Sequence, residues 1–294
     1  MRRAALYPLV AVFSAVWSSA FVAGKIGTAA MDPLVLLTWR FGLTTVALFP
    51  AALARGGLFQ ATAVGAGAAL GLLYNVAYLG LTFAALRFVS ATVVILIVGL
   101  SPFGTALMAA VAGQERLSAP RLCGMGLGFG GVALIALGQG ADRITGIGVG
   151  LCACGMLAFC AGTVFYRARA TGIDAVRLTF WQSAAGFAAL LPAECITGQA
   201  WPVWTPRTVV VVAYLALVVG IGGMGLWFFL IRASGPAVAS TYHLLNPVFA
   251  LIYAHLVFGA PVAWRDAAGA GLVCLGLFLV RPGAERAAKR DESF

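Results

Sequence analysis

Long apolar runs dominate the chain, and charged residues, proline or glycine separate them at short intervals. Each run is close to the roughly 20 residues that a helix needs to cross the hydrocarbon core of a bilayer. The pattern therefore predicts about ten transmembrane helices joined by short loops. The predicted spans are 6–24, 33–54, 61–84, 89–112, 120–138, 145–168, 175–197, 208–231, 236–257 and 264–281.

Composition narrows the class of protein. The 294 residues are 62% hydrophobic and 10% charged, whereas soluble domains have roughly half apolar and a quarter charged residues. A soluble globule is excluded, and ten spans leave no room for a separate catalytic domain. Outer-membrane strands would alternate apolar and polar residues over segments of about ten, and these runs do not. The fold class is an all-α integral membrane protein.

The net charge of +10 does not indicate a nucleic-acid partner, because the 19 Lys and Arg residues are scattered along the chain and all except Arg40 lie at the ends of apolar runs or outside them. With the N-terminus inside, inner segments hold thirteen of these residues and outer segments five. This bias predicts cytoplasmic termini and the lipid bilayer as partner. The six cysteines match no metal-ligand spacing, so we expect no metal and no cofactor.

The sequence repeats itself at an offset near 145, which pairs Pro102 with Pro247. An offset of 142 pairs Asp32 with Asp174. A repeat of five spans enters the membrane from the opposite side in its second copy, so 1–142 and 143–294 are predicted to be inverted repeats. Inverted repeats are typical of secondary transporters, and a duplicated structural bundle is the alternative. Other pairs are Trp39 with Trp181, Pro50 with Pro192, Gly124 with Gly269 and Gly131 with Gly276.

Several motifs also have a familiar form: VWSSAFVAGKIG at 16–27, WRFG at 39–42, FAALRFVSATVVILIVGLSPFGTALMAAVAGQERLS at 83–118 and PAVASTYHLLNPVFALIYAHLVFGAPV at 236–262. They resemble the EamA-type branch of the drug/metabolite transporter superfamily, and most of all the bacterial aromatic amino acid exporters. The resemblance implies a ten-helix, two-repeat carrier in the bacterial inner membrane, with both termini cytoplasmic. The second repeat departs from the pattern, since Gln182 stands where Arg40 stands in the first.

Polar side chains inside a bilayer are costly, so each is a functional-site hypothesis. Those predicted here would line an apolar, aromatic cavity for a small molecule, although Ser, Thr and Asn also join membrane helices structurally. Ser14, Ser18, Phe21, Tyr74, Phe159, Tyr166 and Ser240 lie on the same predicted faces. The predicted substrate-binding residues are Trp17, Asn75, Tyr78, Thr163, Trp227, Tyr242, His243 and Asn246.

Charged and titratable groups are rare within the predicted spans. His243 is the mid-membrane group that ordinarily titrates near physiological pH, so it could carry a proton or be a satisfied core histidine. The Asp and Glu residues fall near span ends, which disfavours a mid-membrane carboxylate relay. Arg40 lies within the second span, where it could bind a substrate carboxylate or have a structural role.

Proline and glycine supply two further predictions. Pro102 and Pro247 fall mid-span at equivalent positions, and proline there removes a backbone hydrogen bond and bends the helix. They are predicted hinges, with static kinks as the alternative. Gly124-x-x-x-Gly128 allows close helix packing, either within the chain or between two copies in a homodimer.

Together these observations predict a secondary carrier that exports small amphipathic metabolites, most of all aromatic or apolar amino acids. A carrier of other small metabolites or drugs and a channel-like facilitator remain as alternatives. A membrane enzyme would need a metal cluster, a nucleophile with its base, or paired carboxylates, and the sequence indicates none of these. A receptor or scaffold would not require an inverted repeat.

Overall fold

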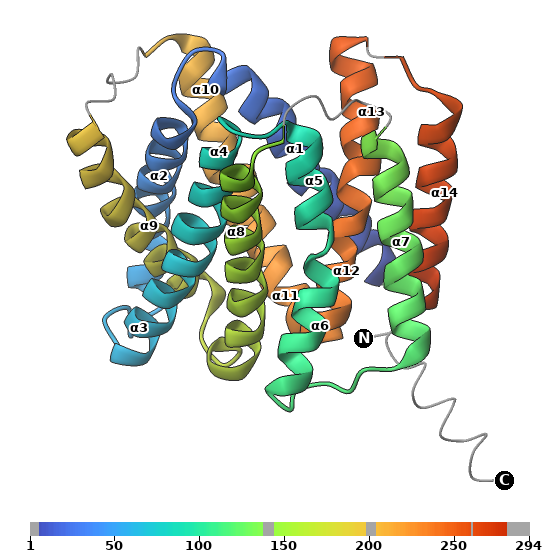
Figure 1. The fold of residues 1–294 in the computed structure, drawn as a ribbon. Helices are drawn as coiled ribbons and strands as arrows, with labels where there is room; N and C mark the ends of the chain where they lie inside the picture. The colour runs from blue at the N-terminus through green and yellow to red at the C-terminus, as the bar shows by residue number, and fades with distance from the viewer. Residues whose placement is uncertain (1–5, 138–143, 198–203, 260, 281–294) are drawn as a thin grey trace, which may run out of the picture.

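The computed structural model describes residues 6–137, 144–197, 204–259 and 261–280, and in these ranges the chain is helical with no strand. Figure 1 shows the helices side by side in one bundle. The elements are α1 (Leu6–Thr28), α2 (Pro33–Ala54), α3 (Ala61–Leu70), η2 (Gly71–Gly80), α4 (Leu81–Ala85), α5 (Ala91–Gly99), α6 (Ser101–Val111), α7 (Ala119–Leu137), α8 (Gly146–Phe165), η3 (Tyr166–Ala170), α9 (Ala175–Thr197), α10 (Pro206–Tyr214), η4 (Leu215–Gly223), α11 (Met224–Ser234), α12 (Pro236–Thr241), η5 (Tyr242–Leu245), α13 (Asn246–Phe258) and α14 (Trp264–Leu279).

These elements form helical stretches that follow the predicted spans closely. In the described part of the chain, eight stretches are long and apolar enough to cross a membrane. The stretches formed by α9 and by α14, which has 16 residues, lie outside that set. The all-helical membrane architecture is confirmed, and the count of ten spans stays a prediction. The predicted cytoplasmic termini lie outside the described residues.

Three of the described helical stretches contain π-helical segments, namely η2, η3 and η4. The segment η2 begins at Gly71, within the third predicted span, and η4 begins at Leu215, within the eighth. π-helical turns are rare and occur often at functional sites. The third and eighth predicted spans begin theirs 144 residues apart, close to the repeat offset, and the sixth holds η3.

The fourth and ninth predicted spans are each divided into shorter helices. Pro102 is the second residue of α6, and Pro247 is the second residue of α13. Proline in a first turn removes no hydrogen bond that the helix would otherwise make. Each proline therefore lies in the first turn of the helix that follows a short interruption of its span. The hinge role itself stays a prediction.

Side chains from neighbouring helices bind the carbonyl groups at these breaks. Ser14 Oγ donates to the carbonyl of Tyr242 at 3.4 Å, and Ser18 Oγ donates to that of Asn246 at 3.1 Å. At the other break, Cys160 Sγ donates to the carbonyl of Ser101 at 3.4 Å. A buried carbonyl without a partner is costly in a membrane. Ser14 and Ser18 therefore have a structural contact where a binding role had been considered.

Glycine brings α7 and α14 into close contact at one edge of the bundle (Figure 1). A Cβ atom on Gly276 would lie 2.6 Å from the backbone nitrogen of Gly128, and one on Gly131 would meet the carbonyl of Gly269. We call this contact the glycine seam. Because α14 covers Gly124 and Gly128 within the same chain, the GxxxG pattern is not available as a homodimer face.

Candidate substrate-binding site

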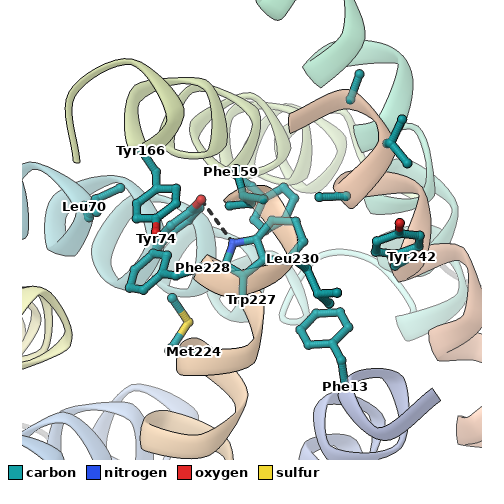
Figure 2. Close-up of a cluster of buried hydrophobic side chains, with 14 of the residues drawn as sticks. Phe13, Leu70, Tyr74, Phe159, Tyr166, Met224, Trp227, Phe228, Leu230 and Tyr242 are labelled. Carbon is teal, nitrogen blue, oxygen red and sulfur yellow. Dashed lines mark hydrogen bonds between the residues drawn. The ribbon is translucent and has the colours of Figure 1, made fainter. Parts of the chain in front are cut away.

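An aromatic cluster occupies the interior, with the fully buried Trp227 at its centre (Figure 2). The Trp227 ring stacks with Phe13 and with Phe159, with centroid distances of 5.6 Å in both cases. Trp17 extends the group, with its ring centroid 5.3 Å from that of Phe13. These four rings come from α1, α8 and α11, so helices far apart in sequence meet here. We refer to Phe13, Trp17, Phe159 and Trp227 as the aromatic cluster.

A chain of hydrogen bonds anchors Trp227. Its Nε1 atom donates to the Tyr74 hydroxyl at 3.2 Å, and Tyr74 donates to Thr163 Oγ1 at 3.1 Å. Thr163 in turn donates to the carbonyl of Phe159 at 2.8 Å. This series of hydrogen bonds gives the buried indole N–H of Trp227 an acceptor. It also links Trp227 to the helix that carries Thr163 and Phe159.

His243 lies against all four rings of the aromatic cluster. Its ring centroid is 4.6 Å from that of Trp227 and 5.1–5.2 Å from those of the other three. The Nδ1 atom lies 2.9 Å from Asn246 Nδ2, and since an amide nitrogen only donates, Nδ1 accepts this hydrogen bond. Nε2 is buried and has no hydrogen-bond partner in the described part of the chain. His243 therefore presents an unused polar atom inside an aromatic enclosure.

Helix irregularity places His243 and Asn246 at this point. His243 belongs to the 3₁₀ segment η5, which joins α12 to α13, and Asn246 begins α13. A continuous α-helix would direct the same side chains differently, because 3₁₀ and α-helices differ in residues per turn. The break in the ninth predicted span is therefore part of the site.

Tyr78 and Arg40 are the two remaining predicted residues whose surroundings differ. The ring centroid of Tyr78 is 4.9 Å from that of Phe159, and the Arg40 guanidinium lies over the Phe41 ring, 5.7 Å from its centroid. Arg40 forms no ion pair among the residues that the structure describes, and its Nε atom is buried without a partner. Tyr78 therefore extends the aromatic cluster, and Arg40 stays a predicted position within the second span.

Asn75, a predicted substrate-binding residue, forms its hydrogen bonds with Gln182 of the same chain. Asn75 Nδ2 donates to the carbonyl of Gln182 at 3.0 Å, and Gln182 Nε2 donates to Asn75 Oδ1 at 3.2 Å. Both side chains are buried. In this conformation Asn75 therefore joins η2 to α9.

The remaining predicted residues divide into two groups. Trp17, Tyr78, Thr163, Trp227, His243 and Asn246 meet in and around the aromatic cluster. The Tyr242 hydroxyl is instead 2.9 Å from Ser234 Oγ. Phe21 is 54% exposed and faces outward, so its assignment to the cavity is wrong. No three His, Cys, Asp or Glu side chains come together as a metal site in the described ranges.

Phe13 is the contact that the sequence prediction missed. It is fully buried and stacks on Trp227. Its spacing of four residues before Trp17 places both on one helical face, and that signal could have identified it. Phenylalanine is so common in apolar spans that its presence alone indicates little.

A separate apolar groove of about 290 Å³ lies between α1, α10 and α13. Its wall includes Ser19, Tyr214 and Tyr253. Because Ser19 and Trp17 are two residues apart on α1, they project to nearly opposite sides of that helix. The groove is therefore distinct from the aromatic cluster, whose central rings are packed together in this conformation.

Comparison with known proteins decides the family. A model described as the EamA-like transporter family matches residues 4–137 and, again, residues 146–281. The chain belongs to the EamA-like transporter family. The resemblance noted in the sequence is thus confirmed at this level, and the chain is a multi-pass membrane protein of a transporter family.

Relatives of this EamA-family chain extend over nearly its whole length. Two proteins of Archaeoglobus fulgidus are each described as an uncharacterized transporter. The first is 26% identical over 284 residues, covering 92% of this chain and 95% of the relative. The second is 22% identical over 266 residues, covering 90% and 94%. Neither description names a substrate.

A solved structure supports the fold. A crystal structure of a protein that is 20% identical to this EamA-family chain superposes with a TM-score of 0.81, covering 95% of this chain and 97% of that one. At this level of identity the likeness shows the fold alone.

Proposed function

We propose that this chain is a secondary transporter that exports small amphipathic metabolites, foremost aromatic or apolar amino acids, across the inner membrane of a bacterium. The observation that carries the proposal is His243 enclosed by the aromatic cluster, between interrupted helices. Apolar sites with a few placed polar groups are the usual form of small-molecule sites. The motifs that resemble aromatic amino acid exporters favour a substrate with an aromatic side chain.

The proposed mechanism is alternating access by two inverted five-helix repeats, 1–142 and 143–294, which together form ten spans. The family model matches in two stretches, and π-helical segments occur at corresponding positions. Breaks precede Pro102 and Pro247 in both halves. These features support a duplicated unit whose copies exchange shapes. The mechanism requires no cofactor, and we propose no enzymatic activity.

The proposed orientation places both termini in the cytoplasm, on the count of thirteen inner and five outer basic residues. Single cysteines in a cysteine-free background test it. A thiol near Phe294 should react with an impermeant reagent only after the cells are opened, whereas one near Asp32 should react in intact cells. Labelling of the terminal thiol from outside intact cells would show that the orientation is the opposite of the one proposed.

Export of other small metabolites or drugs, and channel-like facilitation, are the alternatives within transport. The packed core of this conformation, with Tyr74 and Trp227 buried, supports a carrier, since a channel needs a continuous path. Counterflow distinguishes the two. A carrier loaded with unlabelled substrate accumulates labelled substrate transiently, and a channel does not.

Reconstituted protein tests the site. We expect His243→Ala, Tyr78→Ala and Trp227→Phe to reduce saturable counterflow of phenylalanine about tenfold or more, which corresponds to about 1.4 kcal/mol. Leu256→Ala is the matched control, because Leu256 is 73% exposed on α13. All four variants should yield monodisperse protein. Parental KM and rate in the three site variants would place the binding site elsewhere.

A further inference from the structure

The apolar groove between α1, α10 and α13 lies among helical stretches that are long and apolar enough to cross a membrane. Along α1 it extends from Ser19 to Ile26, which is about 10 Å at the helical rise. The hydroxyl groups at its Ser19 end are already bound. Ser19 Oγ lies 2.6 Å from the Tyr214 hydroxyl, and the Tyr253 hydroxyl donates to the carbonyl of Ala15 at 3.1 Å. The wall that remains is aliphatic.

The other end of the groove opens where three helix ends meet. Gly27 follows Ile26 on α1, and a Cβ atom on Gly27 would lie 3.0 Å from Val211 Cγ1 of α10. Lys25 Nζ lies 4.3 Å from the ring centroid of Phe258, the last residue of α13. The C-terminal ends of α1 and α13 and the N-terminal end of α10 therefore lie together.

Exposed tryptophans mark the level of this end in the membrane. Trp204 precedes α10 by two residues and is 47% exposed. Trp264 begins α14 soon after α13 ends and is 82% exposed. Tryptophan is enriched at membrane–water interfaces. The groove therefore opens at the level of the lipid headgroups and runs from there into the hydrocarbon region.

Arg207 lies at this opening. It is the second residue of α10, and the residues three, four and seven positions further on line the groove: Val210, Val211 and Tyr214. This spacing places Arg207 on the same helical face, and helical side chains lean towards the N-terminal end of their helix, which here is the opening. Arg207 is exposed and forms no ion pair within the described ranges. Lys25 adds a second positive charge at this end.

We infer that the groove binds one acyl chain of an anionic phospholipid, whose phosphate group lies at Arg207 and Lys25. An acyl chain descends from the headgroup level in the direction in which the groove runs, and the aliphatic wall suits it. A transported metabolite would need free polar partners, and the hydroxyl groups of the groove are engaged with each other and with the backbone. A helix of a second copy is about 10 Å across, too wide for a groove of about 290 Å³.

A chain in this groove would hold α1 against α10 and α13. The same helix α1 carries Phe13 and Trp17 of the aromatic cluster, and its Ser14 and Ser18 bind carbonyl groups at the break before α13. The inference goes beyond the proposed transport function and does not depend on it. It predicts that anionic phospholipid stabilises the fold through contacts on the side of α1 opposite Trp17.

Photo-crosslinking maps the site in the purified full-length protein. In phosphatidylcholine nanodiscs, a trace of phosphatidylglycerol with a diazirine in one acyl chain should label mainly the peptides of α1, α10 and α13 that line the groove. The same chain on phosphatidylcholine should label them about fivefold less, because a basic residue near the membrane surface favours anionic lipid by roughly that factor. Glycerol 3-phosphate, which has the charge without the chain, should not compete.

Filling the groove tests the acyl chain. Val210 lines the groove and is 66% exposed, so the larger ring of Val210→Trp can occupy the groove without disturbing the core. We expect groove labelling to fall at least tenfold, and added phosphatidylglycerol should no longer raise the thermal midpoint in detergent. Val209→Trp is the matched control, since Val209 is 49% exposed, lies next in the helix and does not line the groove.

Changing the charge tests the headgroup. Arg207→Gln should reduce groove labelling by phosphatidylglycerol about fivefold and leave labelling by phosphatidylcholine unchanged. Arg207→Lys should behave as the parent, because either side chain supplies the positive charge. Arg169→Gln removes an equal charge from an exposed position on η3 and should also behave as the parent.

Uniform labelling of all lipid-facing helices would show annular lipid alone and would overturn the inference. Equal labelling by the two lipids, or unchanged labelling in Val210→Trp, would overturn it too. A dimer that Val210→Trp converts to a monomer would assign the groove to a second copy of the chain. Should Val210→Trp not fold, the labelling map and Arg207→Gln still decide. Counterflow of a small metabolite has no part in these outcomes, so the proposed transporter and the lipid site can fail separately.

Discussion

The glycine seam and the aromatic cluster lie in the same bundle and are built in opposite ways. In the seam, backbone atoms of α7 and α14 approach so closely that a single added methyl group would collide with them. In the cluster, large rings surround His243 Nε2, which has no partner among the described residues. Saturated packing resists rearrangement, whereas rings around an unused polar atom leave room for an alternative partner. We therefore expect the seam to serve stability and the cluster to serve transport.

The largest expected effect comes from adding a side chain to the seam. In Gly276→Ala, the new Cβ would lie 2.6 Å from the backbone nitrogen of Gly128. Backbone cannot move aside as a flexible side chain can, so the helices must separate. Overpacking of this kind costs about 1–3 kcal/mol, and we expect a clear fall in thermal midpoint in detergent.

Gly271→Ala is the control for that substitution. Gly271 lies on the same helix, and no atom lies within 4 Å of its added Cβ. It should match the parent in stability. An equal loss in both variants would mean that helix propensity, and not the seam, sets the effect.

The second prediction concerns the link between Tyr74 and Trp227. Tyr74→Phe leaves the indole Nε1 without its acceptor, and a buried donor without a partner costs about 1–3 kcal/mol. Because the indole is then free to turn, transport per folded molecule should fall about tenfold, measured as counterflow. Full transport with reduced stability would contradict this prediction, because the hydrogen bond would then contribute to stability alone, as the glycine seam does.

The third prediction separates Asn75 from the binding role expected for it. Asn75→Ala and Gln182→Ala should each lower stability, and their coupling in a double-mutant cycle should fall within about 0.5–3 kcal/mol. Two hydrogen bonds between the residues are the reason. Transport per folded molecule should not change. A raised KM in Asn75→Ala with normal stability would return Asn75 to the site.

The smallest expected effect comes from the breaks. Pro102→Ala and Pro247→Ala add a backbone donor at equivalent points of the two halves. If the repeats are inverted, they should shift the balance of inward-open and outward-open states in opposite directions, by a few-fold. Thiol accessibility of a reporter near Tyr78 from the two sides measures the shift. A shift of equal sign in both variants would identify the breaks as static features.

Local features of the sequence were sufficient for the helices. The run from Pro33 to Ala54 was predicted and is α2 as observed, because a membrane helix is encoded by consecutive apolar residues and by the proline or charge that ends them. The same reasoning identified Trp17, Trp227 and His243 as interior groups, since polar and amphipathic side chains in a bilayer seek protein partners.

Tertiary structure alone decided which faces meet. Three contacts join segments that are distant in the sequence: the hydrogen bond between Asn75 and Gln182, the stacking of Phe13 on Trp227, and the burial of Gly124 under α14. Phe21 makes no such contact and faces outward. In a soluble protein each helix has a polar face towards water and an apolar face towards the core, so the sequence pattern indicates which side is buried. A membrane helix is apolar towards lipid and towards protein alike, so its sequence determines that it spans but leaves to packing the choice of which side chains line the site.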